Sequence, residues 1–101
     1  MSERFASFRE FYPFYLGEHR NTVCRRLHFV GSCVALGLIV AAIVQHNPWW
    51  LLGAFISGYA FAWVGHFFFE KNRPATFKHP FYSFAGDWVM FRDILIGRIP
   101  F

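Results

Sequence analysis

The longest uncharged segment of this chain constrains its fold more than any other feature. Arg26 is followed by no Asp, Glu, Lys or Arg until Glu70, which leaves 43 residues, 27–69, without a formally charged side chain. A helix that crosses a bilayer needs about 20 predominantly apolar residues. The uncharged segment is therefore long enough for two membrane-spanning helices and a short connection between them.

A polar interruption divides the uncharged segment in two. Residues 45–48 read Gln-His-Asn-Pro, and an Asn followed by a Pro is typical of a helix N-terminus. We expect the first span within residues 22–45 and the second within residues 48–70. Trp49 and Trp50 begin the second span, where aromatic residues commonly mark a membrane interface.

The segment before the hairpin, residues 1–20, has the pattern of a helix that lies on a membrane surface. Its aromatic residues recur every three or four positions among charged residues such as Arg9 and Glu10. We expect Pro13 to kink or shorten this helix, and Gly17 to end it.

The segment after the hairpin is also amphipathic. Residues 80–99 combine large apolar side chains with Asp87, Arg92 and Asp93, and are too charged for a third span. We expect an interfacial helix there, with both aspartates in solvent. The fold class that follows is an all-α membrane protein. It has one domain over residues 1–101: a two-span hairpin with an interfacial helix at each end.

The basic residues predict the orientation in the membrane. The hairpin turn has no Lys or Arg, whereas each flanking segment has five. The positive-inside rule therefore places both termini in the cytoplasm. The net charge of +4 comes from scattered residues without a long basic run, so we expect contact with lipid and none with nucleic acid. Cys24 and Cys33 have no metal-binding spacing, and we interpret them as free thiols.

Four of the five histidines are predicted to converge on the cytoplasmic face. His19 and His28 lie before or at the start of the first span, His66 lies near the end of the second, and His79 follows it. A bend between His19 and His28 would let both join one site. Imidazole binds iron, zinc, copper and nickel, and ionisable residues in a span are commonly functional. We predict a catalytic metal site from these four residues, and no role for His46 in the turn.

Other polar residues near these histidines complete the predicted site. Glu18, Asn21 and Glu70 could orient the metal ligands through hydrogen bonds. Three arginines could pair with a substrate carboxylate, since guanidinium groups match carboxylates in geometry and charge. They are Arg20, Arg25 and Arg73.

Four motifs around these residues resemble a known family. They read EHRN at 18–21, RLHFVG at 26–31, WVGHFFFE at 63–70 and RPAT at 73–76. In this order they are similar to motifs of the small membrane proteins typified by the fungal 2-hydroxy fatty acid dioxygenase of phytosphingosine breakdown. The resemblance extends from Tyr15 to Phe84. The chain looks like a short, bacterial-type member, because longer relatives have further hydrophobic helices between the RLHF and GH motifs.

The resemblance implies a function. Such an enzyme is an Fe(II)-dependent dioxygenase of the membrane that uses O2 to shorten a 2-hydroxy fatty acid by one carbon, an α-oxidation. Carried over to this sequence, the iron ligands would be His19, His28, His66 and His79. We then expect an integral protein of the bacterial inner membrane.

Two other classes of function stay open at this point. His28 and His66 face each other across the predicted hairpin and could hold a haem, which would make the chain an electron-transfer protein. A structural membrane protein without a metal is the other alternative. A two-helix hairpin encloses little space, so a homodimer is also compatible with the sequence.

Overall fold

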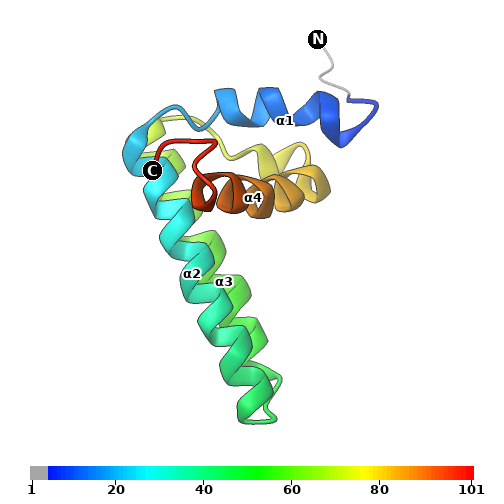
Figure 1. Ribbon diagram of the computed structural model, residues 1–101, viewed down its shortest axis with the longest axis vertical. Coiled ribbons are helices and arrows are strands. Elements are labelled where there is room, and N and C mark those ends of the chain that lie inside the picture. Colours follow the sequence, from blue (N-terminus) through cyan, green and yellow to red (C-terminus); the bar gives the residue numbers. More distant parts are fainter. Residues whose placement is uncertain (1–4) are drawn as a thin grey trace.

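The computed structural model describes residues 5–101, and over that range it contains only helices and connections. In chain order the elements are α1 (Phe8–Gly17), α2 (Thr22–Val44), α3 (Trp49–Val64), η1 (Gly65–Glu70), η2 (Ala75–Phe77) and α4 (Pro80–Leu95). In Figure 1, α2 and α3 form a long hairpin, and α1 and α4 lie one above the other across its open end. The predicted hairpin with flanking helices is confirmed. The start of the predicted N-terminal helix, residues 1–4, lies outside the described residues.

Both arms of the hairpin are long and apolar enough to cross a membrane. They are Thr22–Val44 and the continuous helix Trp49–Glu70, with mean hydropathies of 2.4 and 1.4. Many large apolar side chains along them are exposed, among them Val40, Ile43 and Phe55. Keeping apolar surface in water costs about 25 cal/mol per Å². Lipid around the hairpin would remove that cost.

Small residues bring the two arms close together. A Cβ atom on Gly31 would lie 2.7 Å from the Cβ atom of Phe61. A Cβ atom on Gly65 would lie 3.0 Å from the Sγ atom of Cys24. These glycines therefore set the spacing of the helices at the open end of the hairpin. Cys24 is buried and Cys33 exposed, and both are free thiols, as predicted.

The α1 helix is continuous through Pro13, so the helix does not end at this residue, and the predicted kink there stays a prediction. A proline inside a helix removes one backbone hydrogen bond. The burial of Phe11 and Tyr15, both 0% exposed, offsets that loss because these rings pack into the core shared with α4. The helix ends at Gly17, as predicted.

Asp93 of α4 is buried and Asp87 is half-buried, which corrects the sequence-based expectation that both lie in solvent. Asp93 is 5% exposed and accepts a hydrogen bond of 2.8 Å from the Tyr12 hydroxyl. Asp87 accepts one from the Tyr15 hydroxyl. The reason is that α1 packs directly on α4 and presents its tyrosines to these carboxylates (Figure 1).

Candidate metal centre

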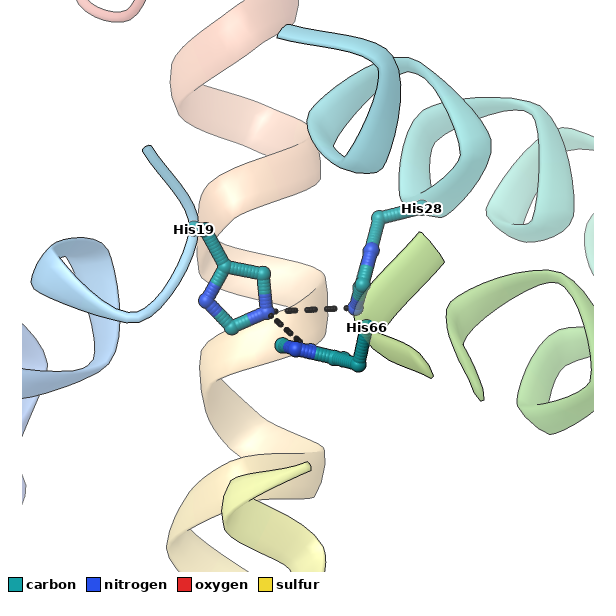
Figure 2. A group of neighbouring side chains, drawn as sticks. All are labelled: His19, His28 and His66. Carbon is teal, nitrogen blue, oxygen red and sulfur yellow. Dashed lines mark hydrogen bonds between the residues drawn. The ribbon is translucent and has the colours of Figure 1, made fainter. Parts of the chain in front are cut away.

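Three histidines from three separate segments meet at the open end of the hairpin. His19 lies in the connection between α1 and α2, His28 lies in the second turn of α2, and His66 lies in η1. They are 2%, 6% and 2% exposed. One ring nitrogen of each lies within 4.8 Å of those of the other two. Figure 2 shows the three rings directed at one another, and we call these residues the histidine cluster.

The spacing within the histidine cluster fits a metal ion. The Nε2 atom of His19 lies 3.1 Å from that of His28 and 2.9 Å from that of His66. Two imidazole nitrogens that each lie about 2.1 Å from a metal, at a right angle, would be about 3.0 Å apart. Both distances therefore match adjacent positions around one metal ion, with His19 next to each of the other two histidines.

The opposite nitrogen of each ring fixes the tautomer. In all three histidines, Nδ1 lies within hydrogen-bond distance of a carbonyl or amide oxygen, which can only accept. Nδ1 therefore carries the proton, and the Nε2 lone pairs face one another with no proton between them. Metal-binding histidines are typically held in this way. The acceptors are the backbone oxygen of Tyr15 for His19 at 2.6 Å, that of Cys24 for His28 at 2.8 Å, and Oδ1 of Asn72 for His66 at 2.7 Å.

Burial favours the neutral form of His19. Its pKa lies well below the usual value because burial disfavours the imidazolium ion, and charge on His28 or His66 would repel it. The neutral imidazole is the form that binds a metal.

The bend between α1 and α2 brings His19 beside His28, as the metal-site prediction required. Asn21 caps α2, since its Oδ1 accepts hydrogen bonds from the backbone N–H groups of Val23 and Cys24. The backbone N–H of Asn21 also donates to Glu70 at 2.8 Å. Asn21 and Glu70 thus tie the start of α2 to the end of η1.

The π-helical turn η1 and the residue after it position His66. Single π-helical turns are frequent at functional sites. Lys71 follows η1 in the left-handed conformation, with φ of 61°, and reverses the chain. Asn72 therefore returns to His66, while its Nδ2 donates to the backbone oxygen of Glu18 at 3.2 Å. Asn72 was not predicted from the sequence; the signal for it is an amide two residues after the end of the helix that carries His66.

A tyrosine–carboxylate pair, Tyr15 and Asp87, covers one side of the histidine cluster. The Tyr15 ring stacks on His19 with centroids 4.0 Å apart, and its hydroxyl donates to Asp87. Burial raises the pKa of Asp87 to about 7, although the Tyr15 hydrogen bond opposes that shift. Asp87 can therefore hold a proton near neutral pH.

The structure does not bring His79 into the histidine cluster. Its ring packs against Phe5 and Phe11, with centroids 5.2 and 5.5 Å away. Its Nε2 atom is buried without a hydrogen-bond partner in residues 5–101. The reason lies in residues 71–79, which lead away from the hairpin before α4 begins (Figure 1).

The three arginines lie in different surroundings. Arg25 donates to the backbone oxygens of His19 and Arg20 at 3.1 and 2.8 Å, so it stabilises the bend before α2. Arg20 itself is exposed. The exposed Arg73 lies over the ring of Phe77, 5.5 Å from its centroid. Their pairing with a substrate carboxylate stays a prediction.

Comparison with known proteins gives one match. The profile of the family described as 2-hydroxy-palmitic acid dioxygenase Mpo1-like matches residues 5–99, which include the whole histidine cluster. No curated protein and no solved structure matches the chain.

Proposed function

The chain belongs to the 2-hydroxy-palmitic acid dioxygenase Mpo1-like family, and on that premise we propose that it is an Fe(II)-dependent membrane dioxygenase that shortens 2-hydroxy fatty acids by one carbon. The observation that carries the proposal is the histidine cluster: three buried imidazoles whose Nε2 lone pairs converge. Many non-haem Fe(II) oxygenases hold iron with two histidines and one carboxylate and keep other positions open; here a third histidine would take the place of the carboxylate. Iron bound here would supply positions at which the 2-hydroxy acid and O2 meet.

The proposed reaction balances without an external reductant. One 2-hydroxy acid and one O2 give the acid one carbon shorter, one CO2 and one water. The bond between the carboxyl carbon and the hydroxyl-bearing carbon breaks, and the latter becomes the new carboxyl group. The four electrons that the two carbons lose are those that reduce O2.

The residues of the chain supply orientation, shielding and a site for a proton. The Nδ1–H donors of the histidine cluster, held by fixed oxygens, keep all three Nε2 atoms directed inward. The Tyr15 ring, 0% exposed, shields the His19 side from water. Asp87 lines the same cavity as His28, so it can accept the proton of the substrate hydroxyl and return it to product.

The geometry favours a bare metal over a haem. In a bis-histidine haem, two imidazoles bind from opposite sides of a flat macrocycle. Here the ring centroids lie 4.5 Å apart for His19 and His28, 4.5 Å for His19 and His66, and 4.9 Å for His28 and His66, so no two of the rings leave space for a macrocycle between them.

The setting that we propose is the bacterial inner membrane, spanned by α2 and the helix Trp49–Glu70, with both termini in the cytoplasm. The two candidate spans and the basic residues on both flanks support this placement. A homodimer stays a prediction.

The test is to purify the protein without oxygen, load it with Fe(II), and measure O2 uptake and product mass with 2-hydroxypalmitic acid. We expect uptake and an acid one carbon shorter from the wild type and from His46→Ala, and neither from His66→Ala. Iron binding without turnover would contradict the proposed reaction. A Soret band would point to the haem alternative, and folded protein with neither iron nor haem to the structural one.

A further inference from the structure

A groove leads from the histidine cluster along the hairpin. One side is a single face of α2, formed by His28, Ser32, Ala35 and Ile39, which are spaced at helical intervals. Residues of α3 form the other side, and α4 covers the end next to the cluster. The groove has a volume of about 160 Å³ and is open along part of its length. It therefore connects the candidate metal centre with the outer surface of the hairpin.

Most of the polar side chains that line this groove lie at one end. His28, Ser32 and Asp87 lie at the end next to the histidine cluster. Ser32 is 8% exposed, and its side chain lines the groove one helical turn from His28. An imidazole, a hydroxyl and a carboxyl group at this end of the groove suit a polar head group. Below Ser32, the wall of α2 is apolar.

The dimensions of the groove suit one extended hydrocarbon chain. The path along α2 from His28 to Ile39 is about 16 Å at 1.5 Å per residue, which accommodates roughly a dozen methylene groups. Ala35 and Ala54, which are 5% exposed, line the groove on opposite arms. Their small side chains form the floor of the groove where the two arms meet, along which a single chain can lie.

We propose that this groove binds the acyl chain of the substrate, with the 2-hydroxy acid head beside His28, Ser32 and Asp87 and the methyl end near Ile39 and Leu51. The identity of the head group rests on the proposed function. The open side lets the chain enter from the bilayer, in which a long-chain acid is already dissolved. The groove then acts as a ruler for chain length.

A photoreactive ligand tests this placement without any need for turnover. The probe is 2-hydroxypalmitic acid with a diazirine near its methyl end, added to the full chain in phospholipid nanodiscs. Mass spectrometry of the peptides then locates the adducts. We expect adducts at Ile39, Leu51 and Ala54, reduced at least tenfold by excess unlabelled acid. Adducts mainly at the exposed Val40 and Ile43, or adducts that the unlabelled acid does not reduce, would overturn the proposal.

Paired substitutions supply the controls. Ile39→Trp fills the groove, whereas Val40→Trp, one residue further and 57% exposed, points outside its lining. We expect Ile39→Trp to lower at least tenfold the labelling that unlabelled acid can suppress, and to shift the preferred substrate to shorter chains. We expect Val40→Trp to change neither the labelling nor the preferred chain length. Equal labelling of both variants would contradict the groove. Ala54→Leu and its control Ala42→Leu, both at buried alanines of the hairpin, repeat the test if Ile39→Trp does not fold.

The outcomes separate this inference from the proposed function. Labelling of the groove that unlabelled acid suppresses, without O2 uptake, would support the acyl site and contradict the dioxygenase reaction. O2 uptake with labelling confined to the outer face would support the reaction and contradict the acyl site.

Discussion

The Oδ1 atom of Asn72 lies 2.7 Å from Nδ1 of His66, and this hydrogen bond orients the ring toward the two other histidines. Asn72 reaches His66 because Lys71 adopts the left-handed conformation and reverses the chain after η1. Its own Nδ2 group is held by Glu18. Asn72 therefore links the loop that follows η1 to Glu18, in the segment before α2.

Loss of this hydrogen bond should weaken metal binding. We expect Asn72→Ala to lower Fe(II) affinity 10–100-fold, the usual effect of removing a residue that orients a metal-binding histidine. Competition with a chelator of known affinity measures it. Asn72→Asp, which still accepts from Nδ1, should retain most of the affinity. The matched control is Asn47→Ala in the hairpin turn, and a similar loss there would contradict a specific role for Asn72.

The close contact at Gly65 should control the stability of the metal-binding end. A Cβ atom there would lie 3.0 Å from Sγ and 3.1 Å from Cα of Cys24, so Gly65→Ala must push η1 away from α2. We expect a loss of about 1–3 kcal/mol of unfolding free energy, as for other overpacked sites. Thermal unfolding in detergent measures it.

Gly37→Ala is the control for that substitution, because a Cβ atom there would meet nothing within 4 Å. Alanine favours a helix over glycine by up to about 1 kcal/mol, so this variant should be as stable as the wild type or more stable. Equal changes in the free energy of unfolding for Gly65→Ala and Gly37→Ala would show that the close approach of η1 to α2 at Gly65 does not control stability.

Asp87 should make stability depend on pH in a defined direction. Its pKa is raised from 3.8 to about 7 in the folded protein, chiefly by burial. Between these values the folded state binds more protons than the unfolded state. The contribution of Asp87 to the free energy of unfolding therefore falls as pH rises from about 4 to 7, and it stays constant above pH 7. Relative to Asp87→Asn, the wild type should lose thermal stability across that window. Parallel curves for the two proteins would contradict the assignment.

The sequence predicted the hairpin because charge and hydropathy are local properties. The uncharged residues 27–69 and the polar turn at 45–48 specify two spans without any knowledge of tertiary contacts. The same topology placed His19, His28 and His66 at one end, and the structure brings these three together.

The rest of the site depends on contacts between distant segments, which a single sequence does not reveal. His79 follows the second span by only nine residues, but the direction of the connection carries it away from the cluster. Asp87 was interpreted as a solvent-exposed residue because nothing in the sequence shows that α1 packs on α4. The orienting role of Asn72 depends on the left-handed Lys71, a conformation that lysine rarely adopts.

The surroundings of His79 predict a structural role for it. Its Nε2 atom has no hydrogen-bond partner within the described residues, and its ring contacts phenylalanines. Phenylalanine at this position would keep the ring contacts and remove the unpaired nitrogen. We expect His79→Phe to be as stable as the wild type or more stable by about 1 kcal/mol. A clear drop in the thermal midpoint would contradict this role.

The most direct test of the metal centre is the iron content of five single variants, purified without oxygen and shown by circular dichroism to be folded. The account predicts one iron per chain in the wild type, His46→Ala and His79→Phe, and almost none in His19→Ala, His28→Ala and His66→Ala. Full iron content in any of the last three, or its loss in His79→Phe, would contradict a centre built from His19, His28 and His66.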